Sequence, residues 1–387
     1  MAAGCKCNGA VLTRGWGLAN LLAFTRSLDC VGSEEGVTKG NRSEIVVTPF
    51  ECGEESVVGI VGGIHDGKSF RCICHFSEDT MDFSVVIPCH NASQWIVETL
   101  RSVASQTVCP KEIVVVDDAS TDDSARQILE SGVKVRLVSA NVRNGAAARN
   151  VGAEAATGDW LAFLDADDCW YPDHLEKAQA VLQEASDVAF FSPVDRQFAD
   201  GQVEATTNRW PPQKPTSGLS ACECVRFWNI RRAWQTSTMV IKRDRYLAVG
   251  GGDADQQAGQ DFEMWLRVIH GQTWSYCPSA TGLYRAAIPG SVSRSNRART
   301  RYFEMRGLTK NYELYQDCVP YRELVRRASV GAMHIAMLFP DRAYTPQVWE
   351  AARPWMPRAA RVFFAVLRCF PRLYGTLYRI RGRIMKA

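Results

Sequence analysis

From Met81 onward, short apolar runs alternate with segments of helical periodicity, and this alternation limits the possible folds more than any other feature of the chain. The runs are rich in Val, Ile and Phe, which favour buried strands. Strands are expected at Phe83–Pro88, Glu112–Asp118, Lys134–Ala140, Trp160–Leu164, Asp187–Val194 and Ser237–Lys242. Because strands separated by helices usually form a sheet that those helices cover, the sequence predicts an α/β protein with a mostly parallel, mixed sheet.

Helices are expected between these strands, where polar capping residues precede apolar residues at helical spacing. The expected starts are Asn91 or Ser93, Ser120, Asn144 and Pro172. Residues 196–236 show neither periodicity, so an irregular insertion is expected there.

Charge is distributed unevenly along the chain. The 387 residues carry 45 Lys and Arg against 42 Asp and Glu, a net charge of +3, which argues against a nucleic-acid partner. Residues 351–387 hold nine of the basic residues and no acidic ones, which leaves 36 basic against 42 acidic residues elsewhere. A tail in which Arg alternates with aromatic and aliphatic residues either lies on an anionic membrane surface or packs on the rest of the protein.

Cysteine usage and hydropathy indicate the compartment. Fourteen cysteines in so long a chain predict reduced thiols in a cytosolic protein. No apolar run approaches the roughly 18 residues of a membrane span, and the apolar stretch Trp16–Phe24 lacks a signal-peptide cleavage site. We therefore expect a cytoplasmic protein, with peripheral attachment to the inner face of the membrane as an open alternative.

Unusual polar residues follow three of the expected strands. They are Pro88-Cys89-His90-Asn91, Asp117-Asp118 and Asp165-Ala166-Asp167-Asp168. Each group alone could be a turn or a helix cap. Together they indicate a ligand site, because ligands of open α/β sheets bind beyond the carboxyl ends of the strands.

The cluster Asp165–Asp168 is the sharpest of these signals, since neighbouring carboxylates repel unless a cation or solvent offsets them. Oxygen ligands without a neighbouring His favour Mg²⁺ or Mn²⁺ over Zn²⁺. A calcium loop starting at Asp165 would have Cys169 and Trp170 at positions that need a ligand and a glycine, which excludes that interpretation.

Four blocks of this sequence together resemble an inverting GT-A glycosyltransferase of family two, over roughly residues 82–295. The blocks are FSVVIPCHN (83–91), VVVDDASTDDS (114–124), NGAAARNVGAEAATGDWLAFLDADD (144–168) and GQDFEMWLR (259–267). The resemblance implies a Rossmann-like GT-A sandwich, which we expect to span residues 81–295. Residues 1–80 would then be an extension of unknown role, dispensable for catalysis, and residues 296–387 a helical region with a basic amphipathic tail.

The resemblance also implies a role for individual residues. The first loop, with Pro88, Cys89 and Asn91, would hold the nucleotide base together with Asp117 and Asp118. Arg149 would lie beside the nucleotide, and Asp165 and Ala166 on its ribose side. The metal ligands would be Asp167, Asp165 and Asp168, and the catalytic base would be Asp261.

This resemblance implies a metal-dependent enzyme of polysaccharide or glycolipid assembly at the cell surface, with Mn²⁺ or Mg²⁺ as cofactor. The donor would be a nucleotide-sugar, with a UDP-sugar favoured, and the acceptor a saccharide or a lipid-linked hydroxyl. Two alternatives remain open. A non-catalytic nucleotide-sugar binding module would keep the site without turnover. A sugar-phosphate nucleotidyltransferase needs a Gly-rich phosphate loop after the first strand, which Pro88–Asn91 does not supply.

Overall fold

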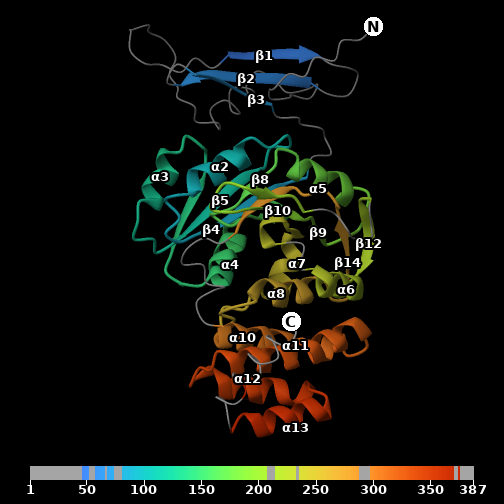
Figure 1. Ribbon diagram of the computed structural model, residues 1–387. Helices are drawn as coiled ribbons and strands as arrows, with labels where there is room; N and C mark the ends of the chain where they lie inside the picture. The colour runs from blue at the N-terminus through green and yellow to red at the C-terminus, as the bar shows by residue number, and fades with distance from the viewer. Residues whose placement is uncertain are drawn as a thin grey trace.

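The computed structural model describes residues 46–51, 57–65, 68–73, 81–206, 214–231, 235–286, 297–369 and 374. Its centre is an eight-stranded sheet with the order β12-β14-β9-β13-β7-β4-β5-β6 (Figure 1). These strands are β4 Phe83–Cys89, β5 Glu112–Asp118, β6 Arg136–Ala140, β7 Trp160–Phe163, β9 Ala189–Phe191, β12 Thr216–Ser220, β13 Val240–Lys242 and β14 Thr273–Tyr276. The pairs β4·β5, β4·β7, β5·β6 and β9·β14 are parallel, whereas β13 and β12 run antiparallel to their neighbours. The predicted mixed α/β sheet is confirmed.

Helices cover both faces of this sheet (Figure 1). One face packs against α2 Ile96–Ala104, α3 Ser124–Glu130 and α5 His174–Leu182, and the other against α4 Gly145–Ala155, α7 Arg243–Ala248 and α8 Gln260–Ile269. Side chains along β4 alternate between the two buried faces. Val85 and Ile87 pack on the side of α2, α3 and α5, and Val86 packs on the side of α4, α7 and α8. Successive side chains of a strand point to opposite faces, so a sheet covered on both sides needs a continuous apolar run.

The close approach of α4 to the sheet depends on a glycine. A Cβ added at Gly152 would lie 2.4 Å from Val86 Cγ1 and 3.1 Å from Val116 Cγ2. Gly152→Ala is therefore expected to lower the free energy of unfolding by about 1–3 kcal/mol through overpacking. Gly331→Ala is the matched control, because it lies in the helix Val319–Leu338 with nothing within 4 Å of the added Cβ.

Chemical denaturation of both variants checks this prediction. The control is expected to be neutral or to gain up to about 1 kcal/mol, since alanine favours helix over glycine. Equal stability of Gly152→Ala and wild type would show that α4 can move away from β4 without cost.

A smaller sheet has the order β11-β10-β15-β8. It consists of β8 Cys169–Trp170, β10 Val194–Gln197, β11 Val203–Glu204 and β15 Gly282–Arg285. Strands of this sheet, together with β12 and α6 Ala221–Arg231, occupy much of residues 196–236. An irregular insertion was expected there, so that expectation was wrong in part. The short, polar strands β11 and β12 give little apolar periodicity to detect.

Of the expected helix caps, only Asn144 is confirmed. Its Oδ1 accepts from the amides of Ala146 and Ala147 at 2.9 and 3.1 Å. The helices α2 and α3 begin at Ile96 and Ser124 without a side-chain cap, so the expected caps Asn91, Ser93 and Ser120 were wrong. Asn91 instead connects two loops, because its Oδ1 accepts from the amide of Thr121 at 2.7 Å.

Within residues 1–80 the structure describes an antiparallel sheet of β1 Val46–Glu51, β2 Val57–His65 and β3 Lys68–Ile73.

The C-terminal region is helical, as predicted, and packs on the sheet domain (Figure 1). Its helices are α10 Arg297–Lys310, α11 Val319–Leu338, α12 Tyr344–Ala352 and α13 Arg358–Leu367. Tyr321, Val325 and Trp349 share one buried cluster with Trp265 of α8. Among the described residues, no helix combines the length and the apolar composition needed to cross a membrane.

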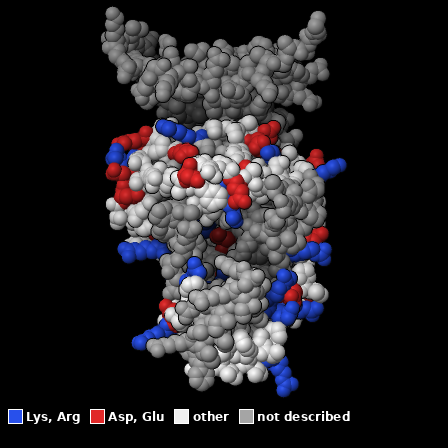
Figure 2. All heavy atoms as spheres, viewed as in Figure 1, with Lys and Arg blue, Asp and Glu red and all other residues white. Residues whose placement is uncertain are grey.

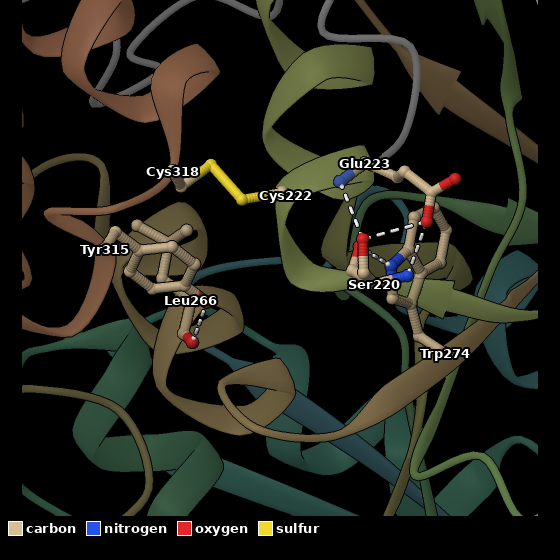
Figure 3. Close-up of a disulfide and its surroundings, with 7 residues drawn as sticks. All are labelled: Ser220, Cys222, Glu223, Leu266, Trp274, Tyr315 and Cys318. Atoms are coloured by element: carbon tan, nitrogen blue, oxygen red, sulfur yellow. Dashed lines mark hydrogen bonds between the residues drawn. A yellow bond between two sulfur atoms is a disulfide. The ribbon is translucent and has the colours of Figure 1, made fainter.

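A disulfide and a hydrogen bond reinforce this packing (Figure 3). Cys222 of α6 is joined to Cys318, which precedes α11, with their Cα atoms 5.8 Å apart. Tyr315 Oη donates to the carbonyl of Leu266 in α8 at 2.7 Å. The expectation of reduced thiols throughout was therefore wrong for this pair, which the fold brings together across 96 residues of sequence.

Candidate functional site

Three predicted site residues from distant parts of the chain meet beyond the carboxyl ends of β4 and β7. Arg149 of α4 lies between Asp165, which follows β7, and Asp261, in the first turn of α8. One guanidinium nitrogen lies 2.5 Å from Asp165 Oδ1 and the other 3.3 Å from Asp261 Oδ1. The arginine side chain is 9% exposed, whereas the two carboxylates are 35% and 37% exposed. A buried cation therefore links two carboxylates that solvent or a ligand can still reach.

The charged side chains of this site shift one another's pKa values. Burial alone would lower the pKa of Arg149, but Asp165 and Asp261 raise it above the ordinary value, so the guanidinium stays charged. Burial raises the pKa of Asp261; Arg149 opposes this shift and Asp165 adds to it. A carboxylate with a raised pKa is a better proton acceptor than an ordinary aspartate, which suits Asp261 to general-base work.

The C-terminal region fixes the helix that carries Asp261. Glu263, one turn into α8, has a fully buried carboxylate that forms a two-pronged ion pair with Arg267 at 2.8 and 2.7 Å. Lys310 of α10 lies 3.6 Å from Glu263 and 2.9 Å from Asp253, in the loop before α8. The position of Asp261 thus depends on residues beyond the expected boundary at 295.

The three aspartates of the loop after β7 have different surroundings. Asp168 is 1% exposed, and both its oxygens accept from the protein: Oδ2 from Ser237 Oγ at 2.5 Å and Oδ1 from the Arg285 amide at 3.0 Å. Burial, followed by repulsion from Asp165, raises the pKa of Asp167 to about 6. This arrangement favours Asp165 and Asp167 as ligands and makes Asp168 an anchor of the loop.

The two aspartates at the end of β5 hold backbone amides of neighbouring loops. Asp118 is buried, and its carboxylate accepts from the amides of Val142, Arg143 and Asn144 at 2.6, 2.9 and 3.1 Å. It therefore shapes the loop before α4, and its oxygens are already committed to that loop. Asp117 is half-buried, and its Oδ1 accepts from the Ser120 amide at 3.3 Å.

Positive φ angles mark the same loops. Asn91, Ala119 and Arg143 have φ of 51°, 54° and 50°. Such conformations cost free energy in residues other than glycine and gather at functional sites.

The remaining predicted residues line the strand ends. Pro88 is half-buried, and Cys89 is 1% exposed. Burial, together with Asp117, raises the pKa of the Cys89 thiol to about 11, so it is not a nucleophile. Ala166 is 6% exposed, and its carbonyl accepts from Thr99 Oγ1 at 2.9 Å.

Three residues that support the acidic loop were missed by sequence reasoning. They are Thr99, Ser237 and Arg285. Thr99 and Ser237 lie within expected elements and look like ordinary polar residues. Arg285 lies within the resemblance over roughly residues 82–295 but outside its four blocks.

The oxygen ligands offered here fit a divalent cation that is also ligated by a substrate. Within the part of the chain that the structure describes, no three His, Cys, Asp or Glu residues form a ready metal cluster. Asp165 and Asp167 nevertheless repel each other, which a cation would relieve. Mg²⁺ is commonly held by one or two carboxylates plus substrate phosphates, so this pair fits a metal that arrives with a nucleotide.

Comparison with known proteins agrees with this geometry. Residues 84–244 match the family described as glycosyl transferase family 2. The amylovoran biosynthesis glycosyltransferase AmsB of Erwinia amylovora is 40% identical over 200 residues, which cover 48% of this chain and 64% of AmsB. Chondroitin synthase of Escherichia coli is 26% identical over 204 residues, covering 50% of this chain and 29% of the synthase. The chain thus spans less than two thirds of these relatives.

A crystal structure of S. aureus TarS 1–349 in complex with UDP-GlcNAc has a TM-score of 0.59. It is 17% identical and covers 77% of this chain and 92% of that structure, so it shows a shared GT-A fold. Residues 84–244 thus have the sequence of a glycosyl transferase family 2 domain.

Proposed function

We propose that this chain is a metal-dependent, inverting glycosyltransferase that moves a sugar from a nucleotide-sugar, with a UDP-sugar favoured, to a hydroxyl group of a saccharide or lipid-linked acceptor. The observation that carries this proposal is the contact of one buried arginine, Arg149, with both Asp165 and Asp261. It brings the candidate base beside the loop that would hold the nucleotide. Members of this family generally use a divalent cation.

Each residue of the site has a task in this reaction. Asp261 would take the proton of the acceptor hydroxyl as that oxygen attacks the anomeric carbon. Because one displacement from the opposite face forms the new bond, the configuration is inverted. Arg149 would hold Asp261 in place and supply positive charge beside the departing nucleoside diphosphate. A cation bound through Asp165 and Asp167 would act as a Lewis acid on the diphosphate oxygens.

Two comparisons support the substrate class. AmsB is named for amylovoran biosynthesis, and the TarS structure contains UDP-GlcNAc. The UDP-GlcNAc complex is consistent with a UDP-sugar donor. The name of AmsB is consistent with a glycosyltransferase of polysaccharide biosynthesis. We also propose that residues 1–80 are dispensable, because they supply none of the residues placed at the site.

A thermal-stability screen of nucleotide-sugars with Mn²⁺ tests the donor proposal. A bound donor stabilises the folded state by RT ln(1 + [L]/Kd), about 2.7 kcal/mol at a hundredfold excess over Kd. We expect UDP-sugars to raise the melting temperature with Mn²⁺ present and to have little effect with a chelator. The same shift in the presence of chelator would contradict the metal requirement.

Turnover separates the enzyme from the non-catalytic binding module. Slow hydrolysis of the stabilising donor by wild type, lost in Asp261→Asn, supports transfer chemistry. NMR coupling constants of the product's anomeric proton would reveal inversion or retention, and retention would contradict the single displacement.

The helix α13 supports peripheral attachment to a membrane. Phe364 and Leu367 pack inward, whereas Val362, Phe363 and Val366 are 59%, 49% and 58% exposed. Arg358 and Arg361 on the same helix are exposed, and residues 351–387 contain no acidic residue. In Figure 2, basic side chains predominate over the lower part of the molecule, where the C-terminal helices lie. An apolar stripe flanked by arginines suits an anionic lipid surface.

Flotation with anionic vesicles checks this attachment. Wild type is expected to bind phosphatidylglycerol vesicles more strongly at low salt than at high salt. The double variant Val362→Ser/Phe363→Ser should lose most of this binding. Leu129→Ser is the control, because Leu129 is 71% exposed on α3, outside the stripe. Equal flotation of the double variant and wild type would exclude α13 as the lipid-binding surface.

A further inference from the structure

Arg285 is a buried cation that the proposed mechanism does not use. It ends β15, and its side chain is 6% exposed. β15 pairs antiparallel with β8, which begins directly after the aspartates of residues 165–168. This pairing places Arg285 against the acidic loop, although some 120 residues separate them in sequence.

Arg285 contacts three successive residues at the end of that loop. Its side chain donates to the Asp167 carbonyl at 2.6 Å, and its backbone amide donates to Asp168 Oδ1 at 3.0 Å. A further side-chain nitrogen lies 3.5 Å from Cys169 Sγ. The arginine therefore restrains the backbone that carries the Asp167 side chain.

The other partners of Arg285 belong to α2. The guanidinium lies 2.5 Å from Glu98 Oε2 and 4.8 Å from the centre of the Trp95 ring. A buried cation needs such compensation, since its burial without partners is costly. Arginine is a rigid, planar fork that bonds the carbonyl and the carboxylate through separate nitrogens, whereas lysine would have to reach both from one nitrogen on a flexible stem. The loop is thereby connected to a helix packed on the sheet.

We infer that Arg285 is the positioning residue of the acidic loop, holding Asp167 where a cation bound to a nucleoside diphosphate needs it. This inference rests on the proposed function.

The test compares Arg285→Met and Arg285→Lys with Arg245→Met in the full-length chain. Arg245 is a matched control, because it also donates to backbone carbonyls, those of Arg267, Val268 and His270 at 3.0, 2.7 and 2.8 Å. These carbonyls lie at the far end of α8 from Asp261. A general loss of stability should therefore appear in both Arg285→Met and Arg245→Met. A displacement of the acidic loop should appear only in Arg285→Met.

Two readouts are needed. Hydrogen exchange of the amides of residues 165–170, without ligand, should speed up in Arg285→Met and stay unchanged in Arg245→Met. Calorimetric titration with Mn²⁺ and UDP should show roughly 10–100-fold weaker binding in Arg285→Met, the range typical when the support of a metal ligand is removed. Arg285→Lys should recover only part of both effects, because it keeps the charge and loses the fork.

The outcomes separate this inference from the proposed function. Unchanged exchange at residues 165–170 in Arg285→Met, or equal Mn²⁺–UDP affinity of that variant and wild type, would overturn the role of Arg285. If wild type itself fails to bind Mn²⁺ and UDP, the proposed donor and metal are wrong. Faster exchange of residues 165–170 in Arg285→Met would then show that Arg285 restrains the loop, while its link to the metal would be overturned.

Discussion

Asp261→Asn is expected to lower the rate of sugar transfer by roughly 10²–10⁴-fold, the usual contribution of a general base. Asparagine keeps the shape of the side chain but cannot accept the proton of the acceptor hydroxyl. The ion pair between Arg149 and Asp165 does not involve Asp261, so the nucleotide side of the site should persist. Donor affinity should therefore change little, and nearly all of the loss should fall on kcat.

Steady-state kinetics with saturating donor and Mn²⁺ measure this effect. Because burial raises the pKa of Asp261, wild-type turnover should fall as the pH falls toward that pKa, where the base becomes protonated. The residual activity of the variant should lack this dependence. Asp255→Asn is the control, since Asp255 lies in the loop before α8 with a side chain 90% exposed. Turnover of Asp261→Asn within threefold of wild type would assign the base to another residue.

The sheet was predictable because its determinants are local. Phe83–Cys89 is apolar on both faces, and such a run has few structures open to it other than a buried strand. The carboxylates at the ends of β5 and β7 were predictable for a similar reason, since the strand assignments fix the edge at which they emerge. Asn144 caps α4 through amides only two and three residues away, so its role could also be predicted.

The parts that could not be predicted depend on partners far away in the sequence. Nothing local distinguishes Asp168 from Asp167, yet Asp168 finds internal donors in Ser237 and Arg285, and its oxygens are committed. The pairing of Cys222 with Cys318 likewise requires α6 and α11 to meet. The contact of Lys310 with Glu263 of α8 is also distant in sequence. The sequence therefore placed Asp261 in a domain ending at residue 295 and did not reveal that a residue of the C-terminal region contacts its helix.

Asp167→Ala and Asp168→Ala are expected to affect different properties, although the residues are adjacent. Asp167→Ala should weaken binding of Mn²⁺ with UDP, and Asp168→Ala should lower the stability of the fold. Asp167 lies near Asp165, and burial and that repulsion raise its pKa, so its removal should leave the melting temperature unchanged or raise it. Binding of Mn²⁺ with UDP should weaken by more than roughly a hundredfold, beyond the loss typical of a residue that only supports a ligand.

Asp168→Ala removes the acceptor of Ser237 Oγ and of the Arg285 amide. Two buried donors left unpaired should cost about 1–3 kcal/mol each in the free energy of unfolding. Denaturation and calorimetric titration on both variants separate the two roles. If Asp167→Ala binds Mn²⁺ and UDP as wild type does, while Asp168→Ala keeps its stability and loses that binding, then the metal ligand is Asp168 and its bonds to Ser237 and Arg285 break when the nucleotide binds.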